Sequence, residues 1–179
     1  MLKNIFLYIF IRFLIFYSAL YADLISPVNN SILNYVHVLF EWEQIPDALE
    51  YRFQVSSEDD FSSVVSDTIV SSLVFIDRNN LEWSSNYYWR IKPVYNNQQG
   101  SWSDTNTFTT DAKRSDATAN LYNDQQFNSG LTIFGSFYNY FSAMIDQNGR
   151  EVWNTGDHNL SLIHISEPTR PERIADAGG

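Results

Sequence analysis

The chain has 179 residues, of which 44% are hydrophobic and 16% aromatic, and it contains no cysteine. A disulfide framework and thiolate metal sites are therefore excluded, although a domain of about 90 residues can be stable without them. The formal net charge of −10 repels phosphate backbones, and no basic cluster offsets it, which argues against nucleic-acid binding. The aromatic share favours strands over helices.

Residues 1–22 have the layout of a secretory signal peptide. A basic start at Lys3 is followed by an apolar run over 5–17, and the segment ends in the small residue Ala22, after which we expect cleavage. The alternative is an uncleaved membrane anchor, which Arg12 within the apolar run disfavours. We expect a secreted, periplasmic or cell-surface protein without a permanent membrane span.

Apolar and polar side chains alternate in several short runs between residues 23 and 110. The clearest runs are 36–42, 51–56 and 87–92, and Asn-, Asp-, Pro- and Gly-containing turns separate them. A period of two is that of half-buried strands, and short strands at this spacing predict a β-sandwich. Seven residues should face its core: Phe40, Trp42, Tyr51, Phe53, Tyr87, Trp89 and Ile91.

Particular residues of this segment also match a known family. They are Phe40-Glu41-Trp42, the stretch 48–56, Leu81 six residues before Tyr87, and the closing Trp102-Ser103 and Phe108-Thr109-Thr110. In combination they resemble bacterial fibronectin type III domains. The resemblance implies an all-β, immunoglobulin-like sandwich in which the hydroxyl of Tyr87 bonds back to the main chain at a tyrosine corner.

Three features of the sandwich are candidate sites. Glu58-Asp59-Asp60 could ligate calcium, but no glycine-containing ligand loop accompanies it, so a solvated loop is the preferred interpretation. His37 has no partner at metal spacing and is interpreted as a surface residue. Asn29-Asn30-Ser31 fits a glycosylation sequon. We assign no metal, cofactor or catalytic residue here, and expect a glycan or protein as the ligand of such a module.

Polar residues dominate 111–128, which we interpret as a linker, and a strand pattern resumes in 129–159. Asn148-Gly149 is a strong hairpin signal, because both residues tolerate a positive φ. Residues 142–146 should therefore pair with 151–153. A lone hairpin is marginal in water, so this one requires further strands.

The strand 130–134, the aromatic turn 137–141 and the hairpin Ala143-Met144-Ile145-Asp146 to Val152-Trp153 resemble the opening of arylsulfotransferase-like β-propellers. The resemblance implies sulfuryl transfer between phenolic compounds outside the cytoplasm, with a channel histidine as nucleophile and neighbouring His and Arg residues around the sulfuryl oxygens. Those residues belong to later blades and have no counterpart here, so no catalytic position is assigned, and His158 is left without a role.

The fold class expected from these patterns is an all-β sandwich followed by an incomplete β-propeller hairpin. The expected function is that of an N-terminal fragment of an exported arylsulfotransferase-like protein, itself inactive, with phenolic sulfates as substrates of the full-length parent alone. The alternative is a non-catalytic, secreted or cell-surface fibronectin III-type binding or adhesion protein. A further alternative makes the aromatic residues of 137–141 a sugar platform, and packing in a core is preferred.

The carboxyl-terminal residues differ in kind from the rest of the chain. The run Leu160-Ser161-Leu162-Ile163-His164-Ile165-Ser166-Glu167-Pro168-Thr169-Arg170 resembles a translated sequencing-library adapter. Residues 160–179 are accordingly interpreted as an artefact and set apart from the fold, with a natural tail as the alternative.

Overall fold

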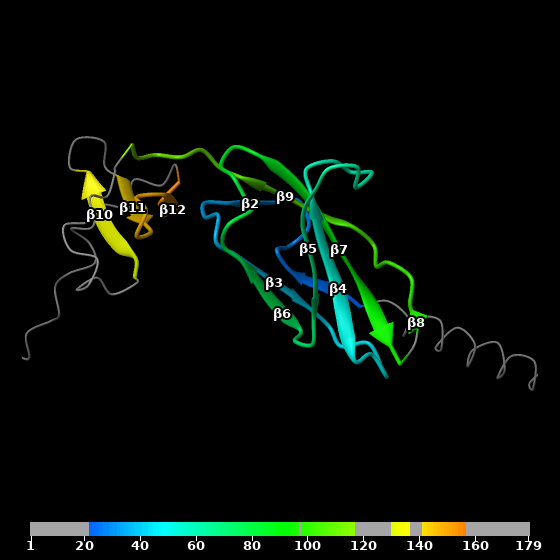
Figure 1. Ribbon diagram of the computed structural model, residues 1–179. Coiled ribbons are helices and arrows are strands. Elements are labelled where there is room, and N and C mark those ends of the chain that lie inside the picture. Colours follow the sequence, from blue (N-terminus) through cyan, green and yellow to red (C-terminus); the bar gives the residue numbers. More distant parts are fainter. Residues whose placement is uncertain (1–21, 97, 117–129, 137–140, 157–179) are drawn as a thin grey trace, which may run out of the picture. The chain divides into compact units, whose positions relative to one another are not determined.

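The computed structural model describes residues 22–96, 98–116, 130–136 and 141–156, and every regular element in these residues is a strand. The chain forms two compact units, Met1–Lys113 and Arg114–Gly179 (Figure 1). Residues 1–21 of the expected signal peptide, the turn residues 137–140 and the tail 160–179 lie outside the described part. None of the described residues forms a helix with the length and apolar character that a membrane crossing requires.

The smaller sheet of unit 1 has the strand order β1-β3-β6, and adjacent strands in it are antiparallel. Along the central strand every second residue from Val38 to Trp42 is buried, whereas Leu39 between them is 41% exposed. This is the period that half-buried strands require. The strands are β1 (Leu24–Ser26), β3 (Val38–Trp42) and β6 (Val74–Asp77).

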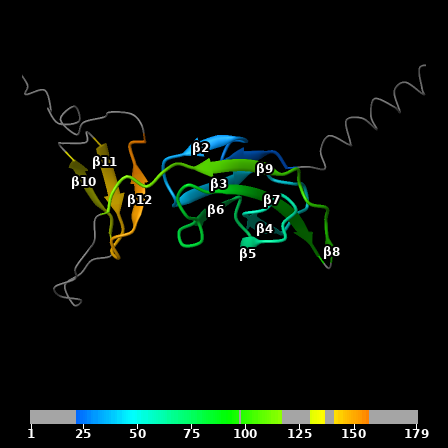
Figure 2. The same ribbon diagram turned by 90° about the horizontal axis from the view of Figure 1, so that it is seen from above.

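The larger sheet has the order β2-β9-β7-β4-β5, with β8 paired to the end of β7. β2 runs parallel to β9, and the other neighbours are antiparallel. In Figure 2, β2, β9, β7, β4 and β5 follow one another from the top of unit 1 to the bottom. The strands are β2 (Ser31–Leu33), β4 (Glu50–Ser56), β5 (Val64–Val70), β7 (Asn86–Tyr95), β8 (Gln98–Gln99) and β9 (Asn106–Thr110).

Aromatic rings join the two sheets. Phe40 of β3 meets Phe53 of β4 and Trp89 of β7 edge-on, with ring centroids 4.7 and 5.2 Å apart. Trp42 of β3 stacks on Phe53 at 6.0 Å. Such pairs stabilise a core beyond the area that they bury. The two sheets thus share one core, which makes unit 1 an immunoglobulin-like β-sandwich and confirms the expected fold class.

All seven residues that the sequence places in the core are buried. Trp42 and Trp89 are the largest of them, and the Nε1 atoms of their indoles have no hydrogen-bond partner among the described residues. Ring packing rather than polar contact therefore holds these two side chains in place. The exposed fractions are 0% for Phe40, Phe53, Trp89 and Ile91, 1% for Trp42, 2% for Tyr51 and 4% for Tyr87.

Two tyrosines bond to the main chain at the ends of the core. The hydroxyl of Tyr87 accepts a hydrogen bond from the amide of Glu82 at 2.8 Å, which is the corner contact that the family resemblance implies. The hydroxyl of Tyr51 accepts one from the amide of Ile45 at the same distance. Each ring thus fills apolar space while its polar end satisfies a loop amide.

The described residues of unit 2 form three antiparallel strands in chain order, β10-β11-β12. Ala143 pairs with Asn154 and Met144 with Trp153, which confirms the expected pairing of the hairpin. Leu131, just before β10, is 52% exposed, and Ile133 on β10 is 56% exposed. The strands are β10 (Thr132–Ser136), β11 (Phe141–Ile145) and β12 (Glu151–Asn154).

The turn of this hairpin uses a positive φ at one residue of the Asn148-Gly149 pair. Gly149 has a φ of 78°, whereas Asn148 does not have a positive φ. The amide of Gly149 donates to the carbonyl oxygen of Asp146 at 3.0 Å. Asp146 Oδ1 also accepts from the amides of Asn148 at 2.8 Å and Arg150 at 3.0 Å. The loop between β11 and β12 thus contains a left-handed glycine, and the side chain of Asp146 satisfies the amides of Asn148 and Arg150.

A buried carboxylate ties residues 114 and 115 to the sheet of unit 2. Glu151, 1% exposed, accepts hydrogen bonds from the amides of Arg114 at 2.9 Å and Ser115 at 2.5 Å. The Nδ2 atom of Asn154 donates a third at 2.7 Å. A buried carboxylate needs such donors. Two residues of the stretch that the sequence assigns to a linker therefore belong to the ordered part of unit 2.

Candidate functional site

The outer face of the larger sheet carries a stack of cations and aromatic rings. The guanidinium Cζ of Arg90 lies 3.6 Å from the ring centroid of Phe61 and 4.2 Å from that of Trp102. Lys92 Nζ lies 4.5 Å from the same Trp102 centroid. These distances are within the range of cation–π attraction. The stack joins the loop after β4, the strand β7 and the segment before β9.

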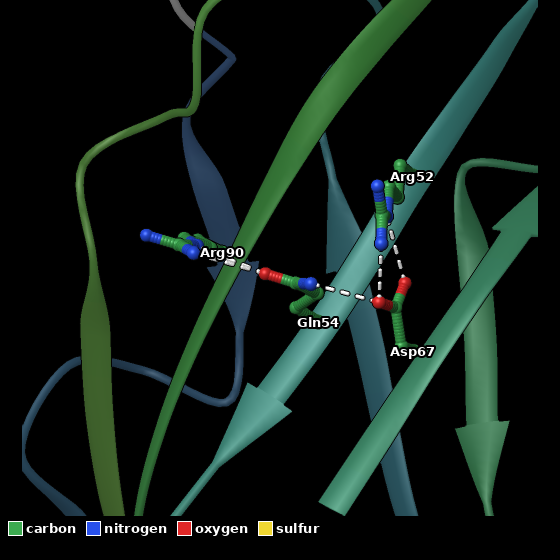
Figure 3. A network of polar contacts seen from close by, with 4 residues as sticks. All are labelled: Arg52, Gln54, Asp67 and Arg90. Carbon is green, nitrogen blue, oxygen red and sulfur yellow. Dashed lines mark hydrogen bonds and ion pairs between the residues drawn. The ribbon is translucent and has the colours of Figure 1, made fainter. Parts of the chain in front are cut away.

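A polar network continues from Arg90 across the sheet to β5 (Figure 3). Arg90 donates to Gln54 Oε1 from Nη2 at 3.0 Å, and Gln54 Nε2 donates to Asp67 Oδ2 at 2.8 Å. Arg52 holds the same carboxylate in a bidentate pair, with Nε–Oδ1 and Nη2–Oδ2 distances of 2.9 and 2.6 Å. Gln54 thus links Arg90 to the carboxylate that holds Arg52, so Gln54 orients Arg90 while Asp67 orients Arg52.

Strand register explains why these side chains meet. Gln54 of β4 lies opposite Arg90 of β7 on one side and Asp67 of β5 on the other. Two residues further along the same pair of strands, Arg52 of β4 lies opposite Lys92 of β7. Residues two apart on a strand point to the same face, so the outward positions form two adjacent rows while Phe53 and its neighbours fill the core.

The electrostatics of the network follow from its geometry. Hydrogen bonding to Arg52 holds the pKa of Asp67 below its usual value, and the same bond raises the pKa of Arg52. Partial burial lowers the pKa of Arg90 and of Lys92, and the neighbouring positive charge of Arg52 lowers both further. The outer face therefore holds three cations in mutual repulsion, with one carboxylate among them.

Phe61 reaches the stack through an unfavourable backbone conformation. Its φ is 60°, a left-handed region that bulky side chains rarely adopt. The amide of Phe61 donates to the carbonyl oxygen of Glu58 at 3.1 Å, which closes the turn. Such strain costs about 1–3 kcal/mol and marks positions that the surroundings hold in place. Stacking on Arg90 is one such constraint.

Trp102 is positioned by a pair of contacts to β7. Ser103 donates its amide to the carbonyl oxygen of Ile91 at 2.8 Å and accepts from the amide of Ile91 through Oγ at 3.0 Å. Gly100 packs so closely that a Cβ there would lie 2.7 Å from Cγ of Pro93. Trp102 and Ser103, which the sequence places in the closing strand, precede β9 (Asn106–Thr110), and Ser103 bonds to Ile91 of β7 through both its amide and its hydroxyl.

The candidate sites predicted from the sequence do not belong to this cluster. Asp60 Oδ1 accepts from the amide of Ser62 at 2.8 Å, and hydrogen bonding to the side chain of Ser62, together with this amide contact, lowers the pKa of Asp60. No group of three metal-ligating side chains occurs within the described ranges. His37 is half-buried and lies just before β3 rather than on it. Asn29 of the sequon is exposed, and its Oδ1 accepts from the amide of Thr107 at 2.9 Å.

The sequence did not predict the outer-face cluster, because the alternation of apolar and polar residues identifies the inward, apolar side chains of each strand. A weak signal existed: Arg52, Arg90 and Lys92 all occupy outward positions of strongly patterned strands. The joining rings could not be found in this way, because Phe61 and Trp102 lie in loops. The predicted aromatic turn of unit 2 lies outside the described residues, except for the half-buried Phe141.

No family model matches the chain, and no curated protein matches it. An Fn3-like protein from Clostridium thermocellum has 14% sequence identity, with coverage of 51% of this chain and 100% of that chain and a TM-score of 0.39. A human fibronectin type III domain solved in solution has 18% sequence identity and a TM-score of 0.41, and the match covers 62% of this chain and 85% of that chain. The strand order and buried rings of unit 1 themselves establish its all-β, immunoglobulin-like sandwich fold.

Proposed function

We propose that this chain is the N-terminal part of an exported arylsulfotransferase-like protein, with unit 1 as a non-catalytic accessory module. Strands β10 to β12 would then be the first strands of a β-propeller. Sulfuryl transfer between phenolic compounds would belong to the whole protein, and the residues described here would have no turnover of their own.

The observation that carries this proposal is the antiparallel meander β10-β11-β12. Propeller blades are four-stranded antiparallel sheets whose strands follow in chain order, and three such strands are consistent with an unfinished blade. The meander contains the Asp146-to-Arg150 turn and the strand residues on which the family resemblance rests. Exposed Leu131 and Ile133 are apolar surface that neighbouring blades would cover.

Export is part of the same proposal. Its support is the layout of residues 1–22, with a basic start, an apolar middle and a small residue at the end. The protein would act in the periplasm, outside the cell or on its surface, where phenolic sulfates from the environment are accessible. Detection of the mature protein in an extracytoplasmic fraction, with Asp23 as its first residue, is the expected result.

Long-read sequencing of the gene beyond codon 159 tests the proposal most directly. We expect further propeller repeats with histidine and arginine residues in channel positions, in place of residues 160–179. The whole protein should then transfer sulfuryl groups from an aryl sulfate to a phenol, and residues 23–159 alone should not. Turnover by the fragment, or a gene without propeller repeats, would contradict the proposal.

A second candidate function is that of a non-catalytic, secreted or cell-surface binding protein. The observation that favours it is the outer face of the larger sheet, where Lys92 and Trp102 are both half-exposed. Further sandwich repeats in the complete gene, or a stop codon soon after Asp157, would select this function over the first.

A further inference from the structure

We propose that the outer face of the larger sheet binds an anionic polysaccharide with sparse charges, of the order of one carboxylate or sulfate group per sugar. We call this surface the cationic face, and define it by Arg52, Arg90 and Lys92 with the rings of Phe61 and Trp102. The proposal concerns unit 1 and holds for either candidate function.

The distribution of charge first sets this face apart. Residues 23–110 contain 12 acidic side chains and four basic ones, and three of the four basic ones are on the cationic face. They are brought together by register, since Arg52 lies opposite Lys92, and Arg90 is two residues before Lys92 on β7. The fourth, Arg78, follows β6 of the other sheet. A positive surface in an acidic domain selects anionic partners by local complementarity.

The cations of this face are unequally neutralised. Arg52 is paired with Asp67, whose carboxylate also accepts from Gln54. Arg90 and Lys92 form no ion pair within the described ranges, and their contacts are with an amide oxygen and two aromatic rings. Partial burial lowers the pKa of both groups, and the positive charge of Arg52 lowers it further. An incoming anion would relieve this repulsion. This makes Arg90 and Lys92 the groups that a ligand would meet.

The face is also preorganised and partly apolar. The guanidinium of Arg90 is fixed between two rings and by Gln54, so binding would cost little side-chain entropy there. Ile69, opposite Arg52 on β5, is 52% exposed, and Trp102 is half-exposed. Apolar and aromatic side chains beside polar groups suit the alternating C–H and hydroxyl faces of a sugar ring.

The charge of the rest of the chain decides between classes of polyanion. Between residues 23 and 159 there are 18 acidic and seven basic side chains. Double-stranded DNA carries one charge per about 1.7 Å of its axis, and anionic membranes likewise present dense charge, so the long-range repulsion would be large for both. A polymer with widely spaced anions would suffer less repulsion and could still place one or two of them against Arg90 and Lys92.

The test measures binding of the full chain to polygalacturonate by calorimetry, with dextran as the neutral polymer. We expect binding to polygalacturonate only, and a loss of about tenfold in affinity when salt rises from about 50 to about 200 mM. Lys92→Gln should weaken binding by about fivefold, and Lys92→Gln with Arg90→Gln by more. Arg78→Gln removes the same charge from another surface and should change the affinity by less than about twofold.

Thermal melts of each variant establish that the sandwich is folded when its affinity is measured. Lys92→Gln retains the aliphatic stem at an outward position, so its fold should be unchanged. Equal weakening by Arg78→Gln and Lys92→Gln, absence of binding to polygalacturonate, or binding that does not respond to salt would overturn the proposal. Preferential binding to duplex DNA or to phosphatidylglycerol vesicles would overturn the assignment of the ligand class. None of these outcomes depends on the presence of a propeller.

Discussion

The two units of the chain bury different kinds of side chain. The core of unit 1 is aromatic, and its Phe40, Phe53 and Trp89 rings contact one another between two sheets. The sheet of unit 2 buries few large apolar groups, and Glu151 and Asn154 are as buried as its Val152. Apolar burial stabilises without regard to direction, whereas a buried polar group stabilises only when each of its partners is in place.

This difference predicts that unit 1 is the more stable of the two units when each is considered by itself. Unit 1 encloses its core between two sheets of its own, so it should unfold as one cooperative transition. The described residues of unit 2 depend on the carboxylate of Glu151 and form a sheet of three strands, which is close to the lower limit for a stable sheet. Limited proteolysis should therefore cleave after residue 113 before it cleaves within 23–110. Four variants or conditions sharpen the comparison.

Truncation of the aromatic core should have the largest effect. Trp89→Ala should lower the free energy of unfolding of unit 1 by about 3–5 kcal/mol, because its ring is fully buried against Phe40 and Phe53. Urea denaturation followed by circular dichroism measures the change. Ile69→Ala at an outward, 52% exposed position is the control and should cost less than about 1 kcal/mol. Similar losses for both would show that Trp89 is not central to the core.

Removal of one charge should affect unit 2 alone. Glu151→Gln replaces one carboxylate oxygen by an NH₂ group that cannot accept, so either the amide of Arg114 at Oε1 or that of Ser115 at Oε2 loses its acceptor. The expected cost is about 2 kcal/mol, seen as faster hydrogen exchange at one of these two amides. The urea transition of unit 1 should stay unchanged. Slower exchange, or a loss in unit 1 of the same size, would show that the carboxylate does not have the role assigned to it.

Loss of a single corner hydroxyl should have a smaller effect. Tyr87→Phe keeps the ring against Phe108, at a centroid distance of 5.4 Å, and removes the acceptor of the Glu82 amide. The expected loss of stability is about 1 kcal/mol, the usual net value of one hydrogen bond. Chemical denaturation measures it, with Tyr88→Phe on the outward side of β7 as the matched control. An unchanged midpoint would mean that water replaces the hydroxyl without cost.

The sequence predicted the core far better than the outer face, for a physical reason. Inward positions repeat every second residue, so Phe40, Trp42 and Trp89 can be identified locally. The stack around Arg90 joins Phe61 and Trp102 from separate loops, and Phe61 adopts a φ that its residue type disfavours. Nothing local predicts that contact, because it exists only after β4 and β7 have paired.

The same limit applies to unit 2. The strand pairing of the hairpin follows from two local patterns and a turn signal, and it was correctly predicted. The conformation within the turn depends on a side chain: the carboxylate of Asp146 accepts from two amides, and of the Asn148-Gly149 pair only Gly149 has a positive φ. The contact between Glu151 and the amide of Ser115 spans 36 residues and has no local signature.

Acid should have the smallest effect, and should act on the outer face of unit 1 rather than on its core. The pKa of Asp67 is lower in the folded chain because Arg52 donates to its carboxylate, so the pair stabilises the fold above the unfolded pKa of about 3.9. That stability is lost as pH falls through the lower, folded pKa. Because the pair is one-third exposed, solvent screens it, and its contribution should be the smallest of the four. Urea midpoints compared between neutral pH and the acid range should fall less in Asp67→Asn than in the unchanged chain. An equal fall in both would mean that solvent screens the pair completely, and that the orientation of Arg52 depends on strand register alone.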